Sequence, residues 1–165
     1  MDYHSKLTRQ LGAVKHRVVY TKAGTRLAAS RLDDQQQIVD HKLYWLPVRS
    51  KQEAQYLTAI LNAPVTTEAV ALYQSRGLYG GRDFDAYVWR LPIPIFDPQN
   101  DLHLRLVDLA DEAECLASEV DVCEYGFQKV RGLIRDKLQT EGVMPQIDEA
   151  VADLLGIVPD QIEER

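Results

Sequence analysis

The segment that most constrains the fold is the apolar stretch at residues 91–97, Leu-Pro-Ile-Pro-Ile-Phe-Asp. Pro92 and Pro94 each lack a backbone N–H and have a fixed φ, so this segment must be extended, at the end or the edge of a strand. Turn and cap residues follow it, and leucines at helical spacing begin just after Asn100. The sequence therefore predicts a strand over residues 84–96 that leads directly into a long helix beginning near Asn100.

The size and composition of the chain fit a single soluble domain. It has 165 residues, of which 45% are apolar, enough for one sizeable core. No stretch approaches the roughly 20 apolar residues that span a bilayer, and the N-terminus lacks the apolar region of a signal peptide, so we expect no membrane partner and a cytoplasmic location. Cys115 and Cys123 have neither zinc-site nor disulfide spacing.

Three extended segments are expected in the first third of the chain. Residues 17–23 and 26–32 are predicted to form a hairpin, because Gly24 between them can adopt a positive φ. Residues 35–47 contain the third segment, which is apolar on both faces. Strands of that kind usually lie in the centre of a sheet, so we expect this one to be central.

Helices are expected in the rest of the chain. Ser50 and Glu53 form a capping box that opens a helix ending by Asn62. A second helix is expected from residue 66 or 67 to Gly77, with glycine as its C-terminal residue. Three more are predicted at residues 100–121, 124–140 and 145–155. The predicted fold class is α+β: a small mixed or antiparallel sheet with packed helices, followed by a C-terminal helical region.

The charges are distributed unevenly along the chain. The net charge is −6, yet residues 1–51 hold ten basic and four acidic side chains, whereas residues 98–165 hold six basic and sixteen acidic ones. This asymmetry allows a basic face on the first half and a solvating or partner-facing acidic second half.

Catalytic motifs are absent from the sequence. It contains no glycine-rich nucleotide-binding motif, no HExxH, and no Asn/Asp-Pro-Pro-Tyr/Phe signature of amino-methyltransferases. Its four histidines are scattered and none is paired with a nucleophile. We therefore expect no catalytic residue, no metal site and no cofactor within this chain.

A glycine-rich loop is the best candidate for a contact with nucleic acid. Glycines let backbone N–H groups approach phosphate oxygens, flanking arginines can bind phosphate or guanine, and a tyrosine at the tip can stack on a base or wedge between bases. Alternatively, the arginines pair with Asp83 or Asp85 in a plain connection. The candidate residues are Arg76, Gly77, Tyr79, Gly80, Gly81 and Arg82.

The predicted hairpin carries a second group of candidate contacts. If a two-stranded ribbon enters a DNA groove, its basic side chains can reach phosphates or base edges. The alternative is a solvated outer face of the sheet. The basic side chains in question are Lys15, Arg17, Lys22 and Arg26, with Arg31 at the end of the second strand.

Four segments carry a resemblance to a known family, namely residues 38–45, 53–62, 74–83 and 91–97. Their order and spacing resemble the target-recognition domain in the C-terminal halves of N6-adenine DNA methyltransferases and type IIG restriction-modification enzymes, and more distantly that of type I specificity subunits. The methyltransferase half of such enzymes is absent from this chain.

The resemblance implies a noncatalytic DNA sequence-recognition domain over residues 1–121, with a helical C-terminal extension over residues 122–165. The implied partners are double-stranded DNA and a methyltransferase or restriction catalytic domain. S-adenosylmethionine would bind in that catalytic domain. The alternative function is a protein-interaction or scaffold module that uses the acidic helical half.

Overall fold

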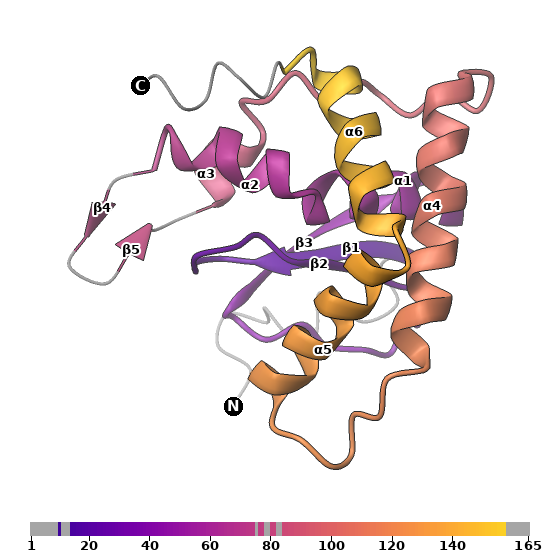
Figure 1. The fold of residues 1–165 in the computed structure, drawn as a ribbon. Helices are drawn as coiled ribbons and strands as arrows, with labels where there is room; N and C mark the ends of the chain where they lie inside the picture. Colours follow the sequence, from indigo (N-terminus) through magenta and orange to yellow (C-terminus); the bar gives the residue numbers. More distant parts are fainter. Residues whose placement is uncertain (1–9, 11–13, 75, 78–79, 82–83, 158–165) are drawn as a thin grey trace.

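The computed structural model describes residues 10, 14–74, 76–77, 80–81 and 84–157. It is an α+β fold in which helices pack on a three-stranded antiparallel sheet, as the sequence predicts. A two-stranded hairpin lies apart from that sheet (Figure 1). The elements are β1 His16–Thr21, β2 Ala29–Leu32, β3 Leu43–Val48, α1 Lys51–Asn62, α2 Pro64–Ala71, β4 Arg76–Gly77, β5 Gly80–Gly81, α3 Asp85–Val88, α4 Asp101–Ser118, α5 Phe127–Thr140 and α6 Val143–Leu155.

The main sheet has the order β2-β1-β3, with β1 in the centre. The predicted hairpin of β1 and β2 is confirmed, and Gly24 between them has φ 142°. Four consecutive residues of β1, from Arg17 to Tyr20, are buried. The prediction that the third strand is central was wrong, because β3 lies at an edge. Pro47 within β3 fits that position, because proline has no backbone N–H to donate and is tolerated in edge strands, which have a partner strand on one side only.

Helix α1 begins at the predicted cap. The Ser50 hydroxyl accepts the Glu53 N–H at 3.1 Å, and the Glu53 carboxylate accepts the Arg49 N–H at 2.6 Å. Asn62 ends α1 and ties it to β2, because its side-chain amide exchanges two hydrogen bonds with the backbone of Ala29. Helix α2 begins earlier than expected, with Pro64 in its first turn, where a proline costs no hydrogen bond.

The predicted strand over residues 84–96 was wrong. Its first part is the short helix α3, and residues 92–97 belong to no helix or strand, with no strand paired to them within the described part of the chain. Side chains from two helices hold this segment instead. The Tyr56 hydroxyl of α1 donates to the Pro94 carbonyl at 3.0 Å, and His103 Nδ1 of α4 accepts the Asp97 N–H at 3.0 Å.

The long helix that follows was predicted correctly. Asn100 caps α4, with its side-chain oxygen accepting the N–H groups of Leu102 and His103. The cap satisfies two of the N–H groups that the first turn of a helix leaves unpaired.

The C-terminal helices share the main hydrophobic core. Gly142, with φ 78°, separates α5 from α6. Ile147 and Val151 of α6 are buried in the same cluster as Ile60 of α1 and Leu106 of α4. Figure 1 shows α6 beside α4 on the same side of the sheet. The division into domains at residues 121 and 122 stays a prediction, although the core includes side chains from both segments.

Among the described residues, no helix combines the length and the apolar character needed to cross a bilayer.

Candidate nucleic-acid interface

The glycine-rich segment forms a small hairpin that projects from the molecule. Arg76 pairs with Gly81 and Gly77 with Gly80 in an antiparallel ladder. Figure 1 draws β4 and β5 away from both the main sheet and the helices. The candidate contacts Tyr79 and Arg82 lie outside the described residues. A segment expected to be an irregular loop is thus partly a ribbon.

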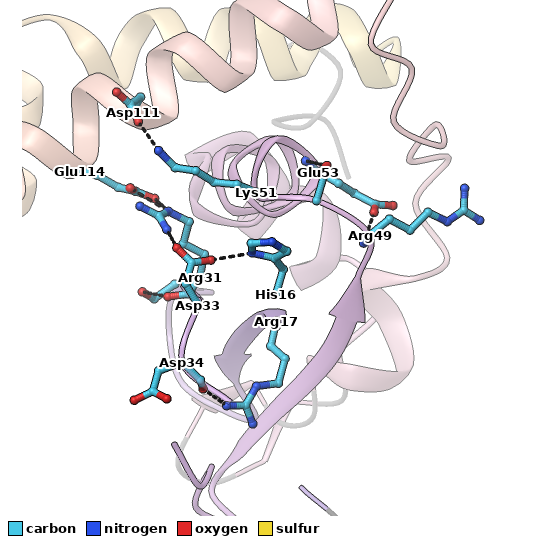
Figure 2. A network of polar contacts seen from close by, with 12 residues as sticks. His16, Arg17, Arg31, Asp33, Asp34, Arg49, Lys51, Glu53, Asp111 and Glu114 are labelled. Atoms are coloured by element: carbon cyan, nitrogen blue, oxygen red, sulfur yellow. Dashed lines mark hydrogen bonds and ion pairs between the residues drawn. The ribbon is translucent and has the colours of Figure 1, made fainter. Parts of the chain in front are cut away.

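Arg17, one of the predicted contacts, serves the interior instead. Its side chain is fully buried, and its Nη2 donates to the carbonyls of Asp34 and Gln37 at 2.6 and 2.8 Å. Its guanidinium carbon also lies 5.7 Å from the centre of the Trp45 ring. Figure 2 shows the side chain directed toward the Asp34 segment. Arg17 therefore fixes the connection between β2 and β3 and is not exposed to a ligand.

Arg31 also binds carboxylates within the fold. Its Nε donates to both carboxylate oxygens of Glu114 on α4, at 2.7 and 2.9 Å, and its Nη1 pairs with Asp33. The hydrogen bond from Arg31 to Glu114 raises the pKa of the guanidinium. His16 contacts the same Asp33 carboxylate at 2.9 Å (Figure 2). This network fastens the edge strand β2 to the acidic helix.

A second contact, between α1 and α4, follows the same pattern. Asp111 of α4 accepts hydrogen bonds from Gln55 at 2.6 Å and from Lys51 at 3.3 Å. The Lys51 ammonium group lowers the pKa of the Asp111 carboxyl, together with the Gln55 amide. Part of the acidic charge of the second half is therefore paired with basic groups of the first half.

The remaining hairpin candidates lie at or near the surface. Lys15 precedes β1, Arg26 lies in the turn between β1 and β2, and both are exposed. Lys22 is half-buried, with its Nζ 4.5 Å from the centre of the Tyr44 ring. None of these three has an ion pair within the described residues.

The aromatic ring that contacts Lys22, that of Tyr44, belongs to a chain of three aromatic side chains. Trp89 donates its indole N–H to the Tyr20 hydroxyl at 3.0 Å, and the two rings meet edge-on with centres 5.9 Å apart. Tyr20 also contacts Tyr44, with ring centres 5.6 Å apart. The backbone fixes this arrangement, because the Phe84 N–H donates to the Lys22 carbonyl at 2.9 Å.

A second cation–aromatic pair lies on the same segment. The Arg90 guanidinium stands 5.0 Å from the centre of the Tyr87 ring. We define the aromatic–basic cluster as Tyr20, Lys22, Tyr44, Tyr87, Trp89 and Arg90.

Trp89 lies at the surface and is 42% exposed. The predicted strand over residues 84–96 would have turned it inward. The helix α3 and the turn after it place the indole at the surface instead. The only local signal was the adjacent Trp-Arg pair after the glycine-rich segment.

Chemically, the cluster contains both cations and aromatic rings. Ammonium and guanidinium groups bind phosphate oxygens, and aromatic rings stack on bases. Within the described part of the chain, no group of histidine, cysteine and carboxylate side chains is suited to hold a metal ion.

No family model matches the chain, and no curated protein matches it. Its function is therefore inferred from its own residues.

Proposed function

We propose that this chain is a noncatalytic DNA sequence-recognition domain of a restriction-modification type N6-adenine DNA methyltransferase, acting with a catalytic domain on the same or another chain. The aromatic–basic cluster carries this proposal. It combines cations that can neutralise backbone phosphates with stacking surfaces, which is the pairing that nucleic-acid sites use.

The charge arrangement of the fold supports this assignment. Two acidic residues of α4, Asp111 and Glu114, neutralise basic groups on α1 and β2. Within the described residues, in contrast, Lys22 and Arg90 contact aromatic faces and form no ion pair with a carboxylate. Such cations remain able to bind phosphate.

The projecting hairpin supplies a shape suited to a groove. The major groove of B-DNA admits a two-stranded ribbon, and a pair of glycines allows close approach of the backbone. In the proposed complex Arg76 of the hairpin, and Arg82 after it in the sequence, contact the duplex, while Lys22, Arg26 and Lys15 contact the flanking phosphates. S-adenosylmethionine would bind in the catalytic partner.

Salt-dependent DNA binding tests the proposal. Fluorescence anisotropy with a labelled duplex pool should show binding that weakens steeply as salt rises. In a Lys22→Ala/Arg90→Ala variant, the slope of log K against log salt should fall by about 0.9 for each phosphate that the variant no longer neutralises. If the hairpin enters the groove, an Arg76→Ala/Arg82→Ala variant should also bind the duplex more weakly than the wild type does.

The matched control is Arg131→Ala/Arg135→Ala, which removes two exposed positive charges from α5. It lowers the net charge by the same amount but alters a helix outside the cluster. Equal salt slopes for this control and for the Lys22/Arg90 variant would remove the cluster from the binding surface. Absence of duplex binding at low salt would refute the proposed function.

One observation favours the second candidate, a protein-interaction module. Val122 and Tyr125, on the connection between α4 and α5, are 60% and 40% exposed, and Phe127, the first residue of α5, is 70% exposed. Apolar groups gathered on an exposed connection are typical of protein contacts. Size-exclusion chromatography with light scattering tests it: self-association that a Phe127→Ser variant abolishes, together with indifference to DNA, would favour this function.

A further inference from the structure

A cavity of about 260 Å³ opens beside the aromatic–basic cluster, between α1 and the proline-rich residues 91–96. Trp89 belongs to both the cavity and the cluster. Phe96, Ile93 and Pro94 supply further apolar wall. Sites for drug-sized ligands run from about 300 to 1,000 Å³, so this cavity suits a single small planar group.

The walls of the cavity are fixed without a ligand. The Trp89 indole is held by its hydrogen bond to the Tyr20 hydroxyl. The Tyr56 hydroxyl holds the Pro94 carbonyl, and the Tyr56 ring lies 5.4 Å from that of Phe96. A ligand would therefore find aromatic surfaces that need no rearrangement, which lowers the entropic cost of binding.

Two charged side chains line the same cavity. Arg49 is exposed, and its guanidinium has no hydrogen bond or ion pair within the described residues. Figure 2 shows the guanidinium pointing away from Glu53. Glu53 accepts the Arg49 N–H through Oε2, and its other oxygen has no hydrogen-bond partner within the same part of the chain. The cavity thus combines aromatic walls with the hydrogen-bond donors of the Arg49 guanidinium and one acceptor, the second carboxylate oxygen of Glu53.

This combination matches the edge of guanine better than that of the other bases. Guanine presents N7 and O6 as adjacent acceptors, which arginine binds in a bidentate manner. It also carries N–H donors on its Watson–Crick edge that a carboxylate can accept. We propose that this cavity binds an unstacked guanine base. The base stacks on the Trp89 ring, and the Arg49 guanidinium donates to the N7 and O6 edge of the guanine.

This assignment rests on the proposed function, in which the base belongs to DNA. The guanine then lies at a position where it is unpaired or extruded from the duplex. The same chemistry would accept a free guanine nucleoside. The experiment therefore has two arms, which separate the cavity from duplex binding.

The first arm uses saturation-transfer NMR with 2′-deoxyguanosine and, for comparison, 2′-deoxycytidine. The intact chain should give a saturable signal for deoxyguanosine and a much weaker one for deoxycytidine. Arg49→Gln should weaken deoxyguanosine binding at least fivefold. Lys42→Gln, which removes an exposed charge from the opposite end of β3, should leave it unchanged.

The second arm compares a duplex carrying one bulged dG with the same duplex fully paired. Stacking of one base on an aromatic side chain is worth roughly fivefold or more in affinity, so the bulged duplex should bind tighter by at least that factor. Arg49→Gln should bring the ratio of the two affinities close to one. A role for Arg49 in phosphate binding alone would weaken both duplexes equally and leave the ratio intact.

The arms fail independently. If both duplexes bind equally and deoxyguanosine gives no signal, the cavity proposal is overturned while DNA binding stands. If no DNA binds yet deoxyguanosine binding depends on Arg49, the proposed function fails and the cavity proposal survives as a nucleoside site.

Discussion

At the scale of single residues, His103 shows how one buried side chain shapes the cavity. The imidazole is 3% exposed, and its ring lies 4.6 Å from that of Tyr56. Because Nδ1 accepts the Asp97 N–H, the ring must be unprotonated at that nitrogen, and the proton of the neutral form lies on Nε2. Burial lowers the pKa of His103 below its ordinary value of 6.5. The hydroxyl of Tyr56 stays neutral too, since burial raises its pKa to about 12.

The lowered pKa of His103 predicts a pH-dependent loss of stability. Between pH 6.5 and the lower pKa of the folded state, the unfolded chain binds a proton that the folded chain does not bind, so the free energy of unfolding falls as the pH falls through this range. The stabilisation is complete above pH 6.5. Titration of this one proton changes the free energy of unfolding by at most about 1.4 kcal/mol per pH unit.

Urea denaturation of the wild type and of His103→Asn between pH 7.5 and pH 5 measures this effect. Asparagine keeps an acceptor for the Asp97 N–H but does not titrate. The stability difference between the two proteins should shrink as the pH falls. Parallel curves across the whole range would show that His103 does not contribute to the pH dependence.

At the scale of elements, α2 depends on a cap that comes from far away in the chain. No side chain at its own N-cap position, Ala63, is able to accept a hydrogen bond. The Asp148 carboxylate of α6 instead accepts the Val65 N–H at 2.7 Å. Burial raises the pKa of this carboxyl, which marks its partly desolvated position between the helices.

Removal of this distant cap should destabilise the fold. We expect Asp148→Ala to lower the free energy of unfolding by about 1 kcal/mol, the usual cost of losing an N-cap acceptor. Asp153→Ala, an exposed change on the same helix, should cost little. Denaturant unfolding monitored by circular dichroism measures both, and equal effects would assign no capping role to Asp148.

Local signals explain which elements were predictable from the sequence. The capping box of α1, the Asn100 cap of α4 and the glycine at the end of α5 each depend on only a few neighbouring residues. The strand expected over residues 84–96 was wrong because the alternating apolar residues there lie on α3 and on a segment without regular secondary structure. The edge position of β3 was readable from Pro47, but the apolar character of both its faces suggested the opposite.

The candidate site was harder to predict, because it depends on contacts between distant segments. Lys22 was already a candidate contact because it is one of the basic side chains of the predicted hairpin. Trp89 was not, since its partner Tyr20 is 69 residues away in the chain. The burial of Arg17 depends on the carbonyls of a connection whose path no local pattern reveals.

At the scale of the whole molecule, the helical end of the chain completes the core on which the sheet rests. Ile147, Ala150 and Val151 are 2% exposed or less, and they belong to one cluster with residues of β1, α1 and α4. This core joins both halves of the sequence, and the Arg31–Glu114 pair reinforces the same junction.

Because α6 belongs to the shared core, we predict a single unfolding transition whose free energy depends on the packing of α6. Ile147→Ala should lower the free energy of unfolding by about 2–5 kcal/mol, the cost of emptying a buried aliphatic site. Val122→Ala, at an exposed position, should change it by less than about 0.5 kcal/mol. Calorimetry and denaturant unfolding measure both. Two separate transitions, with only one shifted by Ile147→Ala, would instead favour an independent unit after residue 121.

The edge position of β3 has a consequence for how copies of the chain meet. An edge strand normally offers a row of N–H and C=O groups that another molecule can extend into a shared sheet. Pro47 interrupts the row of donors, and Lys42 and Arg49 place positive charges just outside the two ends of the strand. Two copies brought edge to edge would therefore repel each other and lack a continuous ladder, which protects the sheet from aggregation.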